Sequence, residues 1–170
     1  MTSIEAGGVM KRAASAETLI APSIELRLLL DSTATCGALS AHRVRLGNGA
    51  DGANPHRHVR SSEMFYVLDG MVDLLVGDDV ITATTGDLVV VPPGSPHAFA
   101  ASAGQNGELL VVITPGIDRF DFFRSVHSVL TGATSPSSLK GVGERFDNYP
   151  AAAPGWDALR RGSAHERTRT

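Results

Sequence analysis

The sequence has a single cysteine and no long apolar run. With only Cys36, no intramolecular disulfide and no multi-cysteine zinc cluster can form, which fits a reducing compartment. The longest apolar stretches, Leu28–Leu30 and Leu88–Val91, are far shorter than the roughly 20 residues that a membrane-spanning helix needs. The basic pair Lys11 and Arg12 is not followed by an apolar segment, so we expect no signal peptide and a soluble, cytoplasmic protein.

The chain also lacks a concentration of positive charge. Its 170 residues include 15 Lys and Arg against 18 Asp and Glu, a formal net charge of -3, and the basic residues are scattered. We therefore expect neither nucleic acid nor a membrane as a partner. A chain of this length is typical of one domain with one hydrophobic core, and we find no internal repeat that would divide it.

Short apolar segments separated by Gly, Asp, Asn and Pro run from Ser23 to Pro115, which predicts an all-β fold with mostly antiparallel strands. Tight turns are expected at Asp69-Gly70 and at Gly77-Asp78-Asp79, because these residues tolerate positive φ. The predicted strands are Ile24–Leu30, Ala38–Leu46, Glu63–Leu68, Val72–Val76, Val80–Thr84, Leu88–Val91, His97–Ala100 and Leu109–Thr114.

The hydrophobic period changes after this region. Apolar residues then recur at intervals of three and four: Phe120, Phe123, Val126 or His127, and Leu130. This predicts one amphipathic helix with Asp118 as its N-cap, whose apolar stripe covers the open end or the back of the barrel. A second short helix is expected around Leu139–Phe146. The Ala, Pro and Gly residues beyond Tyr149 and the polar end of the chain predict an extended or disordered tail.

Four residues have the spacing of a metal site. His56 and His58 are separated by one residue, so a strand would send both imidazoles to one face. Glu63 follows at an odd offset and can join them only if Val59–Ser62 bends or bulges. His97 comes after a proline-rich turn that can deliver it from a separate hairpin. This set predicts one divalent transition-metal ion (Fe, Mn, Ni, Co, Cu or Zn), although polar side chains that merely cluster would show the same spacing.

The sequence resembles the cupin family over about Ile24 to Thr114. The first cupin motif is matched by His56, His58, Glu63 and Gly70. The second cupin motif is matched by Gly86, Pro92, Gly94 and His97. Two positions depart from the family pattern, since Ala50 stands where the first motif opens with glycine and Ala101 where asparagine often follows the second. Neither departure falls on a predicted metal ligand.

The resemblance implies a single double-sheet jelly-roll barrel of the quercetin-dioxygenase type, followed by the C-terminal amphipathic helix. On this basis we expect an N-terminal arm over residues 1–22, the barrel over 23–115, a helical extension over 116–148 and the extended or disordered tail over 149–170. The resemblance also implies a homodimer, because cupin-like chains are often dimers.

Strand alternation predicts the surroundings of the metal. Phe65, Val67 and Phe99 share the inward face with the predicted ligands, so we expect a largely apolar cavity that suits a small organic substrate. His42 lies on the inward face of its strand and could act as a base or support a ligand, although a hydrogen-bonded core histidine would have the same parity. Tyr66 is expected to point outward, toward an interface.

Three functions fit this ligand set. We expect first a dioxygenase that binds dioxygen and cleaves a small aromatic or enolic substrate of the flavonol or polyketide kind, with Glu63 as both ligand and catalytic proton acceptor. The second is a non-redox isomerase or cyclase for a polyketide or sugar, in which the metal polarises a carbonyl. The third is a ligand-binding module without turnover, which the short segment before the first strand disfavours, because it is too short for a helix-turn-helix unit.

Overall fold

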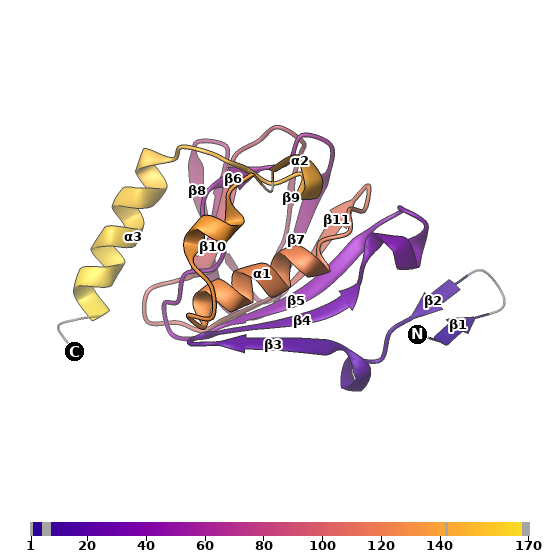
Figure 1. Cartoon of the computed structure of the whole chain (residues 1–170). Coiled ribbons are helices and arrows are strands. Elements are labelled where there is room, and N and C mark those ends of the chain that lie inside the picture. The colour runs from indigo at the N-terminus through magenta and orange to yellow at the C-terminus, as the bar shows by residue number, and fades with distance from the viewer. Residues whose placement is uncertain (1, 5–7, 142, 168–170) are drawn as a thin grey trace.

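A computed structural model describes residues 2–4, 8–141 and 143–167 of the chain. Antiparallel strands form the larger part of its regular secondary structure, and most of the helices follow them in the chain (Figure 1). The strands are β1 (Thr2–Ile4), β2 (Gly8–Met10), β3 (Glu17–Ala21), β4 (Ile24–Leu30), β5 (Ser40–Leu46), β6 (His56–Arg57), β7 (Ser62–Val76), β8 (Asp79–Thr84), β9 (Leu88–Val91), β10 (His97–Ala101), β11 (Gly107–Thr114) and β12 (Tyr149–Pro150). The α-helices are α1 (Phe120–Leu130), α2 (Gly143–Phe146) and α3 (Pro154–Arg167), and the 3₁₀ helices are η1 (Ala13–Ser15), η2 (Ser32–Thr35) and η3 (Pro136–Leu139).

The long strand β7 joins two sheets into a barrel. Its first half pairs with β9 and β11, and β11 continues through β5 and β4 to β3. Its second half pairs with β8 and β10, and β10 continues to β6 and β12. Every one of these pairings is antiparallel, so the predicted antiparallel double-sheet barrel with C-terminal helices is confirmed.

The bend of β7 lies at Gly70, where the sequence predicted a hairpin. The strand does not reverse there but continues from one sheet into the other, with an irregularity in its pairing to β11 between Glu108 and Leu109. Gly70 has φ +75, and an added Cβ would lie 2.1 Å from the carbonyl oxygen of Asn106. A glycine is therefore needed at this corner, and the prediction of a hairpin was wrong because a glycine in the left-handed region bends a strand as well as it closes a turn.

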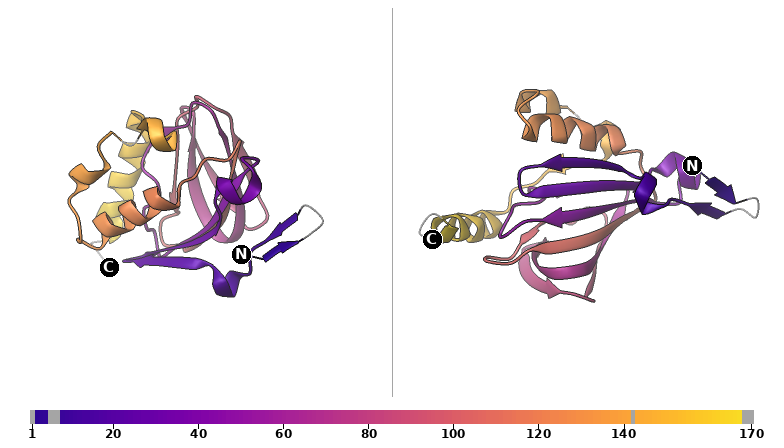
Figure 2. Two further views of the ribbon diagram at one scale, coloured as in Figure 1. Left: turned by 45° about the vertical axis from the view of Figure 1, so that its right-hand side comes forward. Right: turned by 90° about the horizontal axis from the view of Figure 1, so that it is seen from below.

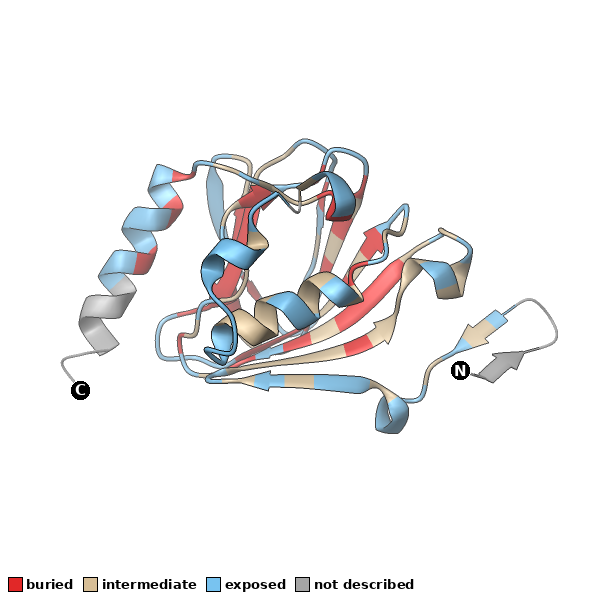
Figure 3. Ribbon diagram, viewed as in Figure 1, coloured by how far each residue is buried: buried red, intermediate tan, exposed pale blue. Residues whose placement is uncertain are grey.

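The core fills the space between the two sheets. Its fully buried members alternate along the strands with outward-facing residues, as a half-exposed sheet requires: Val44, Leu46, Phe65, Val67, Val72, Leu74, Leu109 and Val111. The opposite face of the second sheet is covered separately, because Leu75, Ala98 and Ala100 pack there against Trp156 of α3. Figure 3 shows buried positions along the strands and on the side of α3 that faces them.

Most predicted strands are present, and some elements were missed. β4 and β9 have the predicted bounds, and the turn at Gly77-Asp78 joins β7 to β8 as expected. The segment predicted as an N-terminal arm contains β3, which pairs with β4 at the edge of the first sheet. The residues of β3 are mostly exposed. Its sequence therefore lacks the alternation of apolar and polar residues by which a half-buried strand is predicted.

The helix predicted after the barrel is α1, which lies across β3, β4 and β5 at the mouth of the barrel (Figures 1 and 2). Its N-terminus is capped from another part of the chain and not by Asp118. The carboxylate of Asp31 accepts hydrogen bonds from the amides of Arg119 (2.8 Å) and Phe120 (3.2 Å), whereas Asp118 binds the amide and hydroxyl of Thr33.

The C-terminal segment is more ordered than the sequence predicted. The region expected to be an extended or disordered tail contains β12 and α3, and α3 is fixed to the barrel by Trp156 and Arg160. Arg160 donates hydrogen bonds to Asp51 (2.7 Å) and to the carbonyl oxygens of Gly49 and Ala101. No helix among the described residues is long and apolar enough to cross a membrane.

Candidate metal centre

The first two imidazoles come from β6 and the residue that follows it. His56 is on β6 and pairs directly with His97 of β10, which brings these two side chains together from neighbouring strands. His58 lies two residues after His56, and both side chains are buried while Arg57 between them is exposed. His56 and His58 therefore lie on one face, as the strand pattern predicted. The pattern extends one residue beyond the end of β6.

The bend that Glu63 needs is present and is stabilised by Asp147. The chain leaves β6 after Arg57 and re-enters β-structure at Ser62. The carboxylate of Asp147, which is fully buried, accepts hydrogen bonds from the amides of Val59 (2.8 Å) and Arg60 (3.0 Å). These bonds turn the loop, so Glu63 lies on the same side as the two histidines in spite of its odd offset.

The four predicted ligands converge on one point. Ligand atoms of His56, His58, Glu63 and His97 all lie within 4.8 Å of one another. The Oε2 atom of Glu63 is 2.7 Å from Nε2 of His58, 2.8 Å from Nε2 of His97 and 3.9 Å from Nε2 of His56.

Each imidazole is oriented by a backbone carbonyl on its other side. The Nδ1 atom of His56 is 2.8 Å from the oxygen of Asn54, and that of His97 is 3.0 Å from the oxygen of Ser95. The Nδ1 atom of His58 contacts the carbonyl oxygen of Asp147. A carbonyl only accepts, so these contacts assign the proton of His56 and of His97 to Nδ1 and leave the lone pair of Nε2 facing the common point. The Nδ1 atom of His58 also lies 2.9 Å from Nη2 of Arg119.

This arrangement fits a cation. The carboxylate of Glu63 also only accepts, so its short contacts with Nε2 of His58 and His97 need either a proton on each of these atoms or a positive ion between them. Burial and the nearby imidazole of His97 lower the pKa of His56 to about 3, so this ring is neutral at pH 7. Burial raises the pKa of Glu63, but its contacts with the imidazoles of His58 and His97 outweigh it and hold the pKa well below the usual value. Imidazoles and one carboxylate are donors that a divalent transition metal prefers.

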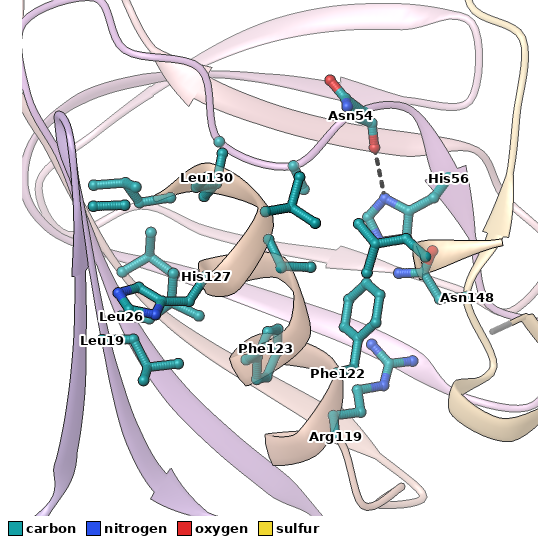
Figure 4. Close-up of a pocket in the computed structure, with 18 of the residues that line it drawn as sticks. Leu19, Leu26, Asn54, His56, Arg119, Phe122, Phe123, His127, Leu130 and Asn148 are labelled. Atoms are coloured by element: carbon teal, nitrogen blue, oxygen red, sulfur yellow. Dashed lines mark hydrogen bonds between the residues drawn. The ribbon is translucent and has the colours of Figure 1, made fainter. Parts of the chain in front are cut away.

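The centre opens into a cavity of about 780 Å³ at the mouth of the barrel. Its walls come from β3, β4, β5 and α1, and the residues after α1 close part of it. His56, Asn148 and Arg119 lie on one side of the cavity in Figure 4, whereas Leu19, Leu26 and His127 lie on the other. A cavity of this size is within the range that holds small organic ligands.

The predicted cavity residues separate into two pairs. His42 and Phe99 line the cavity as expected. Phe65 and Val67 face inward but do not line it, because they are fully buried in the core that lies deeper in the barrel. The ring of Phe65 lies behind that of Phe99, at 5.6 Å between centroids.

Two important residues were not predicted. Arg119, only 3% exposed, reaches the centre from the start of α1: its Nη1 is 3.2 Å from Nε2 of His58, and its Nη2 donates to the carbonyl oxygen of Asp147 at 3.2 Å. Asp147 is the second residue, since it holds both His58 and the loop after it. Both residues lie far in sequence from the ligand that they contact, and no local pattern predicts their roles. The one usable signal for Arg119 was its position next to the predicted start of the helix.

The outer face of the first sheet bears exposed apolar side chains. Tyr66, predicted to point outward, is 38% exposed, and Leu88, which pairs with it on β9, is exposed as well. The homodimer implied by the resemblance stays a prediction.

The family model of the cupin domain matches residues 42–113, which include all four candidate ligands. This segment of the chain is therefore similar to the cupin domain. The match covers the barrel strands from β5 to β11, and the helices that follow the barrel lie outside it. No curated protein matches the sequence.

Several solved structures share the fold of this barrel. KdgF from Halomonas sp. has a TM-score of 0.56 at 22% identity, covering 68% of this chain and 98% of that one. An RmlC-like cupin from Shewanella frigidimarina has a TM-score of 0.54 at 25% identity, with 66% and 94% covered. The nucleoside dehydratase Pac13 of Streptomyces has a TM-score of 0.52 at 20% identity, with 67% and 88% covered. The common architecture is a single cupin barrel.

Proposed function

We propose that the chain is a metal-dependent enzyme that moves a proton on a small organic substrate with a carbonyl or enol oxygen, in an isomerisation, cyclisation or elimination without net oxidation. The observation that carries this proposal is the imidazole of His42. It lines the same cavity as His56 and Glu63 and is not one of the four candidate ligands. The cavity therefore holds a spare proton acceptor beside a site that can polarise a carbonyl.

The surroundings of His42 keep its ring unprotonated. The ring is buried and packs against Phe123 at 4.5 Å between centroids. Burial lowers the pKa of His42 to about 4, with Glu63 raising and Arg119 lowering it, so the ring is neutral at pH 7 and its lone pair can accept a proton.

The proton balance needs no oxidant. A divalent metal held by the four ligands would supply Lewis-acid polarisation of the substrate oxygen. The proton leaves the carbon adjacent to the carbonyl carbon for a ring nitrogen of His42. In an isomerisation or cyclisation it returns to another carbon or oxygen atom of the same substrate, and in an elimination it departs with the leaving hydroxyl group as water. Arg119 holds the substrate oxygen that gains negative charge. The similar fold of a nucleoside dehydratase supports elimination as one of these reactions.

The test is proton exchange under anaerobic conditions. The metal content of the purified protein is measured first, and protein loaded with zinc, manganese or nickel is then incubated in D₂O with α-hydroxy ketones, 2-keto carboxylates and 1,3-diketones. We expect deuterium incorporation by NMR, lowered about 10²–10⁴-fold by His42→Gln at unchanged metal content. Arg45→Gln, an exposed change on the same strand, should exchange like the wild type. Equal exchange in His42→Gln would contradict the role of His42.

Oxidative cleavage is the second candidate. The observation in its favour is the aromatic lining of the cavity, where Phe99, Phe122 and Phe123 surround a substrate-sized space. Oxygen uptake with flavonols and 1,3-diketones, measured with the same metals, distinguishes it from proton transfer. Uptake without exchange favours the dioxygenase, and neither activity with any metal favours a ligand-binding module.

A further inference from the structure

The cavity has two unlike ends, and the polar end holds a buried cation. Arg119 lines the cavity but is only 3% exposed. Its Nε is buried and has no hydrogen-bond partner among the described residues. Such an arginine is costly unless a partner satisfies its donors, since an unpaired buried charge loses its hydration.

The carboxylates near Arg119 have other partners. Glu63, Asp147 and Asp31 are close enough to act on its charge. Glu63 interacts with two imidazoles, Asp147 accepts from two loop amides, and Asp31 accepts from two amides at the start of α1. Within the described part of the chain, none of them forms an ion pair with the guanidinium. The Nη atoms of Arg119 contact His58 and the carbonyl oxygen of Asp147, but its Nε has no partner among the described residues. Since no carboxylate pairs with it there, the guanidinium can still bind an anion that enters the cavity.

The other end of the cavity is apolar. It is formed by Leu19 of β3, Leu26 of β4, and Val126 and Leu130 of α1. No residue of α1 is fully buried, although its apolar stripe faces the barrel, because the cavity separates the stripe from the strands. An apolar surface left open in this way favours an apolar group that fills it.

We propose that the substrate has one anionic oxygen group, a carboxylate or an enolate, which binds Arg119, and an apolar tail that lies between α1 and strands β3 and β4. This inference rests on the proposed function, because it places the anionic group beside the same metal centre. The inference concerns how the substrate binds, however, so it can be tested by binding measurements that need no catalytic turnover.

Calorimetry with matched ligands tests the head group. Octanoate, 1-octanol and acetate are titrated into the full chain, metal-free and zinc-loaded. We expect octanoate to bind the metal-free protein at least tenfold more tightly than 1-octanol, because only the carboxylate satisfies the guanidinium. Arg119→Gln should lose this preference and Arg119→Lys should keep part of it, whereas Arg124→Gln, an exposed change on the same helix, should keep it all. Equal affinities of wild type for octanoate and 1-octanol would overturn the proposal, even if Arg119→Gln fails to fold.

A chain-length series tests the tail. From butanoate to octanoate, each added methylene should tighten binding up to about fourfold. Val126→Trp should fill the apolar end, weakening octanoate at least tenfold while acetate binding stays unchanged. Exposed Val90→Trp on β9 is the control. No dependence on chain length would exclude the apolar tail.

The two proposals fail separately. Octanoate binding that depends on Arg119, without proton exchange on any substrate, would refute the proposed function alone. Exchange on short polar substrates, without chain-length dependence in binding, would refute the substrate class alone.

Discussion

The barrel and the segment after it, residues 116–167, contribute differently to one site. All four candidate ligands lie on or next to the barrel strands β6, β7 and β10. His56 and His97 are oriented by carbonyl oxygens of the barrel, whereas the groups that orient and cover His58 come from the later segment, where Arg119 precedes α1 and Asp147 follows α2. The barrel therefore supplies the ligands, and the C-terminal segment helps to hold His58 and borders the cavity next to the ligands.

The C-terminal segment itself has two parts with different roles. α1 and the residues up to Asn148 border the cavity, whereas α3 packs on the outer face of the second sheet. The first part should therefore affect ligands and the second mainly the stability of the fold. Variants in the barrel and in each of these parts can test this division.

The largest effect is expected in the barrel. His58→Ala removes a ligand, and an incomplete site should lose most of its metal, with affinity falling more than about 100-fold. Elemental analysis of protein purified in parallel measures this directly. Arg57→Ala, which changes the exposed residue between the two histidines, should keep its full metal content. Undiminished metal in His58→Ala would refute the ligand assignment.

Next comes the attachment of α3. Trp156 is 4% exposed against the second sheet, so Trp156→Ala should lower the free energy of unfolding by about 3–5 kcal/mol. Because α3 lies outside the cavity, the folded variant should bind zinc with unchanged affinity. Denaturation and zinc titration together check both parts. Leu159→Ala, an exposed change on the same helix, is the control.

The sequence predicted these regions unequally, for physical reasons. The ligands His56, His58 and His97 follow from strand parity and short motifs, which are local features. Arg119 and Asp147 act through contacts with residues more than 60 positions away, and no periodicity records such contacts. The helix cap shows the same limit, since Asp118 has the right local position but Asp31 from another loop makes the bonds.

The cavity also affects stability at acid pH. The pKa of His42 is about 4 in the fold against an ordinary value of 6.5, so below pH 6.5 the unfolded chain takes up a proton that the folded chain does not bind. The stability from His42 is present above pH 6.5 and is lost as the pH falls toward 4, by roughly 3 kcal/mol in total. Urea denaturation of metal-free protein at pH 4 to 7.5 should show a weaker pH dependence for His42→Gln. Identical slopes for variant and wild type would contradict this.

A smaller effect tests the contact between the two regions. Asp147→Ala removes the acceptor for the amides of Val59 and Arg60, so the loop between His58 and Glu63 should loosen and zinc affinity should fall about 10–100-fold. Asp147→Asn keeps one side-chain acceptor, and asparagine tolerates the positive φ of 48 at this position. This variant should therefore lose less zinc affinity than Asp147→Ala. Zinc titration against a chelator ranks the two. Glu144→Ala, exposed in the same segment, should match the wild type.

The smallest effect separates the two candidate caps of α1. Asp31→Ala leaves the amides of Arg119 and Phe120 without their acceptor and should cost about 1 kcal/mol of stability. Asp118→Ala should cost less, because its bonds to Thr33 are exposed and water replaces them. Since Arg119 begins the helix and reaches the centre, Asp31→Ala should also weaken octanoate binding, whereas Asp118→Ala should not. A larger loss of stability in Asp118→Ala than in Asp31→Ala would support Asp118 as the N-cap, as the sequence predicted. It would also show that the bonds from Asp31 do not hold the start of α1.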